Sequence, residues 1–572
     1  MRLTLTATAA ALSLCLAAPA GAVETTAAQL QADIDALPQK IDSSTHGFVK
    51  WEGADRMAVR QQGDAAVADI ANARLLIDAS DPKPTKVTFD HIELRRSPGP
   101  DNSISWSLVL PALAVVRDAK DQETKLVLKD GAAKGVVDAQ TGQSREFVLG
   151  FASARVDDQK TGGWISFGPL LTSSKLAAEP GGGWTGPMDF ELKGIEFFFT
   201  EGPVGGAIAR IAYGARSAGP DFAALNRLRS RIEKIQQNEN APPADRLNAF
   251  LEILPELPGL FTQLKGETSI ETMSVRAPTG EPLFAFDKAS FGVSLTGLKE
   301  AAAALRITLQ QDGLKLSPSV LEADKVPRRA VVDIGLEEVD TAVLLNLLEI
   351  AGKARVGGSE ADQQRVQQQL IGAAAKLNPV LRIYDLAADT PAVGVDAKAE
   401  ARGSPLSPKG YKADADITVR GFDALAAMLP RASLASFLPL LKELGTSATG
   451  AGGAPTVAFH LASAPPKWLT LNGQDISTWF TPDGRGAEGR KLRPADPPMT
   501  GNDVRAVQQA LGAANVSAPQ SGTYDAATAV AVARYQKQQG LNVDGVVDGE
   551  VRRRLGVKAE TPPPSSPRPR AN

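Results

Sequence analysis

Residues 46–215 alternate apolar and polar positions over short spans, as in MAVRQQGD, KVTFDHIELRR, SISWSLVLP and REFVLGFASARV. Successive side chains of a strand point to opposite faces, so this alternation predicts strands that are buried on one face. The same pattern resumes near Thr268. The sequence therefore predicts a large body that is rich in β-structure.

Helical spacing of apolar residues interrupts these strands. A short helix is predicted over residues 24–42. Two stretches between residues 219 and 265 begin with Pro and Asp, which favour helix starts; they are PDFAALNRLRSRIEKIQQ and PADRLNAFLEILPELPGLFTQL. Later helical stretches are DTAVLLNLLEIAGKAR, SEADQQRVQQQLIGAAAKL and SLASFLPLLKEL. A strand-rich body with interspersed helices belongs to the α+β class.

One layout of apolar and polar positions recurs in MDFELKGI (188–195), FGVSLTGL (291–298) and ADITVRGF (415–422). Three apolar residues at period two are followed by a polar residue, a glycine and another apolar residue. The glycine interrupts the alternation, so we expect a bulge or a tight strand exit there. A fourth copy, VDIGLEEV (332–339), has Glu338 in place of the glycine.

Two interpretations of this repeat stay open at the level of sequence. Half-buried strands resemble one another, so the layout can recur without a common origin. Alternatively, duplicated strand–helix units build a large antiparallel sheet, which can curl into a groove with an apolar inner face. The copies lie about a hundred residues apart at irregular intervals, which is not the period of an ordinary solenoid.

The N-terminus has the layout of an export signal. A positive start at Arg2 is followed by the apolar run LTATAAALSLCLAAPA and by small residues at 20–22. This layout predicts a signal peptide cleaved after Ala22 and a mature protein in the periplasm. The run is shorter than the roughly 20 residues of a membrane span, so we expect no transmembrane anchor. A lipid anchor on Cys15 is disfavoured because the preceding Leu14 is not small.

Charge and candidate chemistry narrow the function further. The chain has 62 Lys and Arg against 65 Asp and Glu, so no nucleic-acid partner is expected. Cys15 is the only cysteine and lies in the export signal, so the mature chain has no thiolate ligand or nucleophile. His46, His91 and His460 lack zinc-site spacing, and no serine-nucleophile or Walker motif is present. We expect no cofactor, no metal and no catalytic residues.

The last part of the chain predicts three short helices. We expect the first to open at Thr500, with Asp503 in a capping-box position, and to bury Val504, Val507 and Leu511 on one stripe.

The second and third helices of this part have clear start and stop signals. Asp525 is the expected cap of the second, Gly540 suits its left-handed C-terminal position, and Asp548 opens the third after an Asp544-Gly545 turn. The buried face expected of the second helix consists of Thr528, Ala531, Val532 and Tyr535.

Three motifs in this unit are spaced as in a known family: Asp503-Val504…Gln508…Leu511, Thr528…Ala531-Val532…Tyr535-Gln536, and Gly540-Leu541…Asp544-Gly545. Residues 499–556 thereby resemble the peptidoglycan-binding domain that is often appended to cell-wall hydrolases and other envelope proteins. Ser521 and Asp525 depart from the family's first loop, which has Asp and Gly at these positions. The body resembles, faintly, an uncharacterised family of proteobacterial envelope proteins.

The resemblance implies that the terminal unit binds peptidoglycan. Sugars and peptide stems are polar and are held by hydrogen bonds and by an aromatic face. Tyr535, Gln536 and Asp544 have an alternative role, because motif residues can recur to build the fold. The candidate contact residues are Gln508, Tyr524, Arg534, Tyr535, Gln536 and Asp544.

These expectations combine into one organisation of the chain. It comprises a signal peptide (1–22), a β-rich body (23–480, with halves 23–265 and 266–480), a Gly- and Pro-rich linker (481–498), the peptidoglycan-binding-like domain (499–557) and a disordered Pro-rich tail (558–572). We expect an exported envelope protein tethered to peptidoglycan, whose non-catalytic body binds an envelope ligand or partner, such as a lipid or lipoprotein. The alternatives are a cell-wall hydrolase with an unrecognised catalytic body and a periplasmic carrier of lipids or lipoproteins.

Overall fold

The structure is a computed structural model that describes residues 25–558 with internal gaps. The gaps are 45–47, 78–82, 118–122, 140–143, 159–161, 179–183, 201–203, 219–262 (except 228, 231 and 232), 298–299, 344–378 (except 346, 350, 368 and 369), 405–409, 429–437, 450–453, 465–466, 481–489 and 496. The chain forms two compact units: unit 1 is Met1–Ala323 with Asp340–Lys376, and unit 2 is Asp324–Val339 with Leu377–Asn572. The predicted export signal and the tail beyond Lys558 lie outside the described residues.

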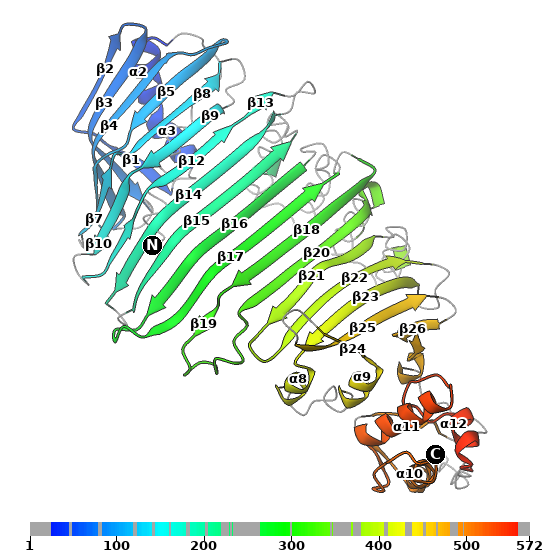
Figure 1. Cartoon of the computed structure of the whole chain (residues 1–572). Helices are drawn as coiled ribbons and strands as arrows, with labels where there is room; N and C mark the ends of the chain where they lie inside the picture. The colour runs from blue at the N-terminus through cyan, green and yellow to red at the C-terminus, as the bar shows by residue number, and fades with distance from the viewer. Residues whose placement is uncertain are drawn as a thin grey trace, which may run out of the picture. The chain divides into compact units, whose positions relative to one another are not determined.

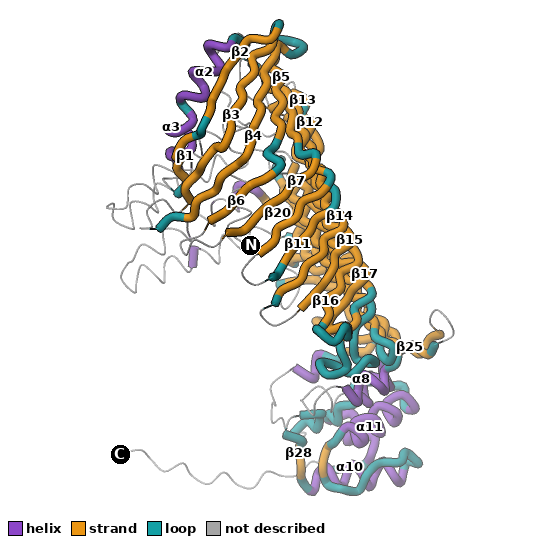
Figure 2. Tube along the Cα trace, turned by 90° about the vertical axis from the view of Figure 1, so that its left-hand side faces the viewer, coloured by secondary structure: helices purple, strands orange, loops and turns teal. Residues whose placement is uncertain are grey.

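Unit 1 begins with two short helices that lie against antiparallel strands (Figures 1 and 2). Leu30 and Ile34 of the first helix are buried against Ala66 and Ala68, and Thr26 caps the helix. The helical structure predicted over 24–42 is thereby confirmed, but it consists of two helices separated at Ala36. The elements are α2 (Ala27–Asp35), α3 (Leu37–Ser44), β1 (Val49–Gly53), β2 (Arg56–Gln62), β3 (Ala65–Ile77), β4 (Thr85–Pro98), β5 (Ser103–Val109), β6 (Leu113–Arg117), β7 (Glu123–Lys129), β8 (Ala132–Asp138), β9 (Ser144–Phe151) and β10 (Ser153–Asp158).

Long antiparallel strands form the rest of unit 1, and β14 to β18 pair in sequence order. The strand-rich body is thus confirmed, except that Gln263 and Leu264, expected at a helix end, begin β16. The elements are β11 (Trp164–Phe167), β12 (Leu170–Lys175), β13 (Ala177–Ala178), β14 (Trp184–Phe199), β15 (Val204–Ala218), β16 (Gln263–Arg276), β17 (Pro282–Thr296), β18 (Ala302–Asp312) and β19 (Lys315–Leu316). Most of the helical stretches predicted between 219 and 262 and between 340 and 377 lie outside the described residues.

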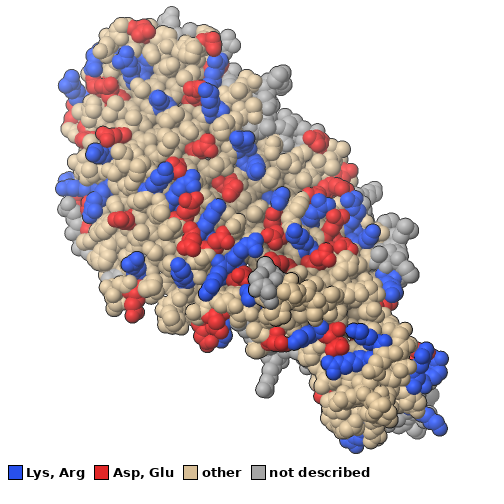
Figure 3. Space-filling view, in the orientation of Figure 1, with Lys and Arg blue, Asp and Glu red and all other residues tan. Residues whose placement is uncertain are grey.

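Cross-strand pairing in unit 1 separates polar from apolar side chains. Glu191 pairs with Arg210 (2.6 Å) and Arg210 with Glu271 (2.7 Å), which gives an ion-pair ladder across β14, β15 and β16. Figure 3 shows acidic and basic side chains mixed over the face in view. The residues next to Glu191 and Arg210 in their strands are apolar and point to the opposite face, as the alternation predicted.

The recurring layout has a common backbone conformation in all four copies. Gly194, Gly297 and Gly421 have φ of 59°, 73° and 67°, and Glu338 adopts 55° at the corresponding position. At Gly194 strand β14 continues, and its pairing with β15 keeps the same register on both sides of the glycine, whereas β17 and β23 end just before their glycines. The predicted strand exit is confirmed for the second and third copies, but the first copy has neither a bulge nor a strand end at its glycine. A strand–helix unit is wrong for the second copy, because strand β18 follows it.

Unit 2 contains antiparallel strands, two short helices and the C-terminal helices (Figure 1). Of the stretch SLASFLPLLKEL, its last seven residues form α9 and the first five lie outside the described residues. The elements are β20 (Arg329–Asp340), β21 (Val380–Asp389), β22 (Gly394–Gly403), β23 (Tyr411–Arg420), α8 (Phe422–Met428), α9 (Leu438–Leu444), β24 (Thr446–Thr449), β25 (Pro455–Ala464), β26 (Lys467–Leu471), β27 (Gln474–Asp475), η3 (Ser477–Phe480), β28 (Met499–Thr500), α10 (Asn502–Ala513), β29 (Thr523–Tyr524), α11 (Ala526–Gln538) and α12 (Gly549–Leu555).

Candidate functional site

Two of the three C-terminal helices begin at the cap residue that the sequence predicts. Asp525 and Asp548 cap α11 and α12, each accepting a hydrogen bond from a backbone N–H three residues on. The expected cap at Thr500 is wrong. Thr500 belongs to β28, and Gly501 occupies the cap position without a side-chain bond. Asp503 instead accepts two hydrogen bonds from Arg490, each 2.8 Å long.

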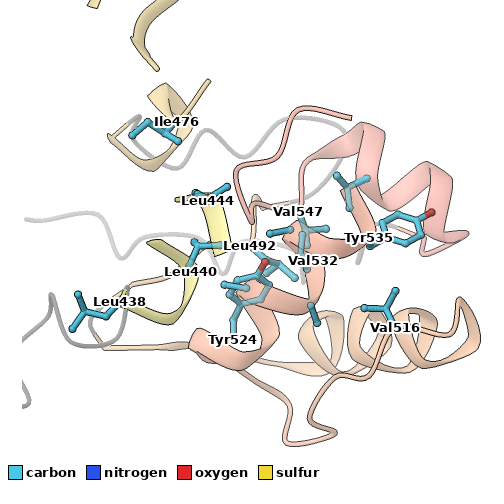
Figure 4. Close-up of a cluster of buried hydrophobic side chains, with 14 of the residues drawn as sticks. Leu438, Leu440, Leu444, Ile476, Leu492, Val516, Tyr524, Val532, Tyr535 and Val547 are labelled. Atoms are coloured by element: carbon cyan, nitrogen blue, oxygen red, sulfur yellow. The ribbon is translucent and has the colours of Figure 1, made fainter. Parts of the chain in front are cut away.

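Apolar side chains of these helices meet in one core (Figure 4). Val504, Val507 and Leu511 of α10 and Val532 of α11 are fully buried, which confirms the predicted stripes. Leu492 is also fully buried and forms a β-bridge with Val547. The core therefore includes residues that precede the three helices.

Gln508 holds the first loop of this unit from inside. Its Oε1 accepts a hydrogen bond from the Gly522 N–H (2.8 Å), and its Nε2 donates to the Thr523 carbonyl (2.9 Å) and to Thr528 Oγ1 (3.0 Å). The side chain is fully buried. Every polar atom of the amide is thus used within the fold.

Gln536 holds the second loop, residues 544–546, in the same way. Its Oε1 accepts from the backbone N–H groups of Asp544 (3.1 Å) and Gly545 (2.8 Å), and its Nε2 donates to Asp544 Oδ1 (2.6 Å) and to the Val546 carbonyl (3.0 Å). The buried Tyr524 hydroxyl donates to the Gly545 carbonyl (2.8 Å), and burial raises the pKa of Tyr524 well above its usual 10.0.

The structure buries most of the six candidate contact residues. Arg534 alone is exposed, and it forms an ion pair with Glu443 of α9 (3.1 Å). This burial favours the alternative that the motif residues build the fold, whereas their contact with peptidoglycan stays a prediction. The five buried residues are Gln508, Tyr524, Tyr535, Gln536 and Asp544.

A buried charge cluster joins the segment before β28 to the three helices. Burial raises the pKa of Asp503, but the hydrogen bonds from Arg490 and the positive charges of Arg490 and Arg552 outweigh this, so the pKa is lowered. Arg552 also donates to the Arg490 carbonyl (2.7 Å). The linker predicted over 481–498 remains a prediction over 481–489, which lie outside the described residues, while Arg490 and Leu492 pack into the folded unit.

Exposed polar side chains lie on one stripe of α10. Asn502, Arg505 and Gln509 are three and four residues apart, the spacing of one helix face. Arg505 lies beside the first loop, since a Cβ on Gly522 would come within 3.3 Å of Arg505 Nη2. Among the described residues, no side chain forms an ion pair with this guanidinium. Sequence reasoning missed this stripe, although its spacing and polarity were visible.

Comparison with known families identifies this part of the chain. Residues 500–555 match the family of the peptidoglycan binding domain. Residues 500–555 are a peptidoglycan-binding domain. The comparisons with curated proteins and with solved structures gave no match for the chain. The matched family is one of binding domains rather than catalytic domains.

The peptidoglycan-binding domain is packed against the end of the unit 2 sheet. Trp479 Nε1 donates to the Asp544 carbonyl (2.8 Å), and Asn542 exchanges two hydrogen bonds with the backbone of Asp475, each 2.7 Å long. Gln474 Oε1 accepts from the Val543 N–H (2.8 Å).

Apolar packing reinforces this contact. Leu440 of α9 is fully buried in the same core as the domain's helices (Figure 4). The second loop of the peptidoglycan-binding domain is therefore covered by the chain itself, whereas the stripe on α10 is exposed.

Two histidines of the body lie among carboxylates on strands. His460 of β25 contacts Asp416 through Nδ1 (2.9 Å) and Asp414 through Nε2 (3.4 Å). The hydrogen bond with Asp416 raises the pKa of His460, and the charges of both aspartates add to this against the opposing effect of burial. A second group of this kind consists of Asp69, His91 and Glu93. In each group the ligand atoms lie close enough together to hold a cation, although no metal site was expected from sequence.

None of the helices in the described part of the chain combines the length and the apolar character that crossing a bilayer requires.

Proposed function

We propose that this chain is an exported envelope protein that its C-terminal domain holds to peptidoglycan. The observation that carries the proposal is the peptidoglycan-binding domain at residues 500–555. The export pattern before Ala22 supports a periplasmic location, because the wall polymer lies outside the inner membrane. N-terminal sequencing of the protein from cells tests export: the mature chain is expected to start at Val23, and retention of the leader would contradict it.

We place the contact with peptidoglycan on the exposed stripe of α10. The second loop is covered by Trp479 and Asp475, and five of the predicted contact residues are buried, so these groups do not meet a polymer in this arrangement. Arg505 offers planar donors that suit the carboxylates of peptide stems. Asn502 and Gln509 add amide groups that can bond sugars and peptides.

Sedimentation with purified sacculi tests this placement with the full-length mature chain. Arg505→Glu is expected to lower the affinity at least about tenfold, because one lost charge-assisted contact and a new repulsion act together. Arg554→Glu makes the same charge change on α12 and is expected to sediment like the wild type. The placement is wrong if Arg505→Glu pellets normally, and the whole proposal is wrong if the wild type stays in the supernatant.

We propose a body without catalytic function, which binds an envelope ligand. Support comes from the exposed, charge-paired settings of His460, Asp414 and Asp416, which resemble surface ion pairs rather than a closed reaction site. Incubating the mature protein with sacculi and analysing the soluble fraction by chromatography tests this part. Released muropeptides would favour the alternative hydrolase.

A further inference from the structure

Four cross-strand rows on one face of β14–β18 hold no charged residue. Residues opposite each other in neighbouring strands share a face, so each row is a continuous line of side chains. The rows are Gly186–Ser217–Leu264–Leu295–Leu305, Met188–Ala215–Gly266–Val293–Ile307, Phe190–Tyr213–Thr268–Phe291–Leu309 and Leu192–Ile211–Ile270–Ala289–Gln311. We call them the apolar rows.

Large side chains in the apolar rows stay exposed to solvent. Met188 is 48% exposed, Tyr213 41%, Leu264 40%, Phe291 46% and Leu309 45%. With strands about 4.8 Å apart and rows about 6.6 Å apart, the rows cover roughly 400 Å² in projection. An uncharged exposed patch of that size is often a functional binding surface.

The opposite face of the same strands shows what a solvated surface looks like here. Glu191, Arg210 and Glu271 form their ladder there, and Lys193 joins Glu191 (3.0 Å). Acidic and basic groups are mixed over the face in Figure 3. Successive residues of each strand point to opposite faces, so both faces are built from the same segments. The absence of charge from the apolar rows is therefore a property of one face and not of the composition of these strands.

The chemistry of the apolar rows favours hydrocarbon over a protein partner. A protein interface carries about one hydrogen bond per 100–200 Å² and a polar rim, whereas the large side chains here are aliphatic or aromatic. The few polar side chains are uncharged, and one of them lacks a partner. Gln311 Nε2 is buried and has no hydrogen-bond acceptor among the described residues. An acyl ester supplies one carbonyl acceptor at the head of a long apolar chain.

We infer that the apolar rows bind the acyl chains of a glycerophospholipid, with an ester carbonyl accepting a hydrogen bond from Gln311. The charged headgroup lies beyond the rows, because they offer it no ionic partner. The breadth of five strands, about 20 Å, accommodates more than one chain side by side. This inference names the ligand of the body and rests on that part of the proposed function, but it does not depend on binding to the wall.

Two pairs of adjacent residues supply matched variants. Phe291→Glu and Leu309→Glu place a carboxylate in the apolar rows, and Ser290→Glu and Thr308→Glu place it one residue away on the opposite face. Phe291 and Leu309 are nearly half exposed, so the substitutions are expected to leave the midpoint of thermal unfolding close to that of their controls. Phe291→Gln and Leu309→Gln serve as milder, uncharged replacements if a Glu variant unfolds early.

The experiment incubates the full-length mature protein with vesicles of phosphatidylethanolamine and phosphatidylglycerol, re-isolates the protein and measures bound phospholipid by mass spectrometry. Wild type, Ser290→Glu and Thr308→Glu are expected to retain phospholipid, and Phe291→Glu and Leu309→Glu to lose it at least about fivefold, because a carboxylate is costly to place against hydrocarbon. Equal loss in the controls, equal retention in all variants, or a wild type that takes up no phospholipid would overturn the inference.

Two further measurements distinguish lipid binding from self-association and from binding to the wall. Light scattering reports the oligomeric state: a wild-type dimer that Phe291→Glu converts to a monomer would assign the apolar rows to a second copy of the chain and overturn the lipid assignment. Phe291→Glu is expected to sediment with sacculi like the wild type. A wild type that does not sediment with sacculi would therefore refute the tether alone, and a wild type that retains no phospholipid would refute this inference alone.

Discussion

The peptidoglycan-binding domain and the β14–β18 sheet of unit 1 use apolar side chains in different ways. In the domain, Val504, Val507 and Leu511 are fully buried against neighbouring helices. In the sheet, Phe291 and Leu309 remain nearly half exposed although they lie mid-strand. The apolar side chains of the domain are thus buried within unit 2, whereas the sheet leaves one face for another molecule or segment to cover.

Polar side chains are likewise buried in the domain and exposed on the sheet. The domain buries Gln508 and Gln536 and gives each several backbone partners, so that loops of the chain are fixed by buried amides. The sheet keeps Glu191, Arg210 and Glu271 on its solvated face, where ion pairs add little stability. Replacing a polar side chain should therefore lower the free energy of unfolding strongly in the domain and only slightly on the sheet.

Replacing Gln536 by Leu should produce the largest effect. It leaves the N–H groups of Asp544 and Gly545 and the Val546 carbonyl without their buried partner. Each such group costs about 1–3 kcal/mol, so we expect a loss of roughly 3 kcal/mol or more in the free energy of unfolding, measured in urea.

Arg534→Leu is the control for this variant, because it lies on the same helix but is exposed. It is expected to change the free energy of unfolding only slightly. If Gln536→Leu is as stable as the wild type but no longer sediments with sacculi, then Gln536 contacts the polymer and its structural role is wrong.

Trp479→Ala tests the contact between the domain and the end of the unit 2 sheet. It removes a half-buried ring from the shared core and the hydrogen bond to the Asp544 carbonyl. We expect a loss of about 2 kcal/mol, less than for a fully buried Trp, and a urea transition that separates into two steps. Trp479→Phe keeps most of the ring and should lose less than half as much. A single, unchanged transition for Trp479→Ala would show that the contact does not couple the two parts.

The domain could be predicted from sequence because its signals are local. Asp525, Gly540 and Asp548 mark helix ends within a few residues of the helices that they bound, and the apolar stripes have helical spacing. Thr500 and Asp503 were misinterpreted because the partner of Asp503 is Arg490, which lies in a segment whose Gly and Pro content indicated a linker.

The contacts that join distant segments could not be predicted. Trp479 and Asp544 are 65 residues apart, and no periodicity connects them. The same holds for the apolar rows: alternation predicted each strand and its two faces, but the register that aligns Phe190, Tyr213 and Phe291 depends on pairing across long gaps in the sequence. Burial of Tyr524 and Gln536 also required the tertiary structure, since polar motif residues suit both a binding surface and a core.

Glu338→Gly should stabilise unit 2 slightly. Glu338 adopts a φ of 55°, where the other copies of the layout have glycine, and a left-handed conformation costs an L-residue about 1–2 kcal/mol relative to glycine. The variant loses an exposed ion pair with Arg402, so we expect a net gain of up to about 1 kcal/mol in the free energy of unfolding. Glu338→Ala loses the ion pair and keeps the strain, and it should be no more stable than the wild type. If Glu338→Gly is less stable than the wild type, the backbone of Glu338 is not strained in the wild type.

The smallest expected effect is the pH dependence contributed by His460. Its pKa is raised above the usual 6.5, mainly by the hydrogen bond with Asp416, so the protonated ring stabilises the folded state. This contribution is complete below the unfolded pKa and disappears as the pH rises through the folded pKa. His460→Gln should therefore lower Tm more at about pH 5.5 than at about pH 8.5, as measured by scanning calorimetry at low salt. Asp416→Asn removes the principal partner, and in that background the pH dependence of the His460→Gln effect should shrink. An effect that instead grows with pH would mean that the neutral ring is the stabilising form.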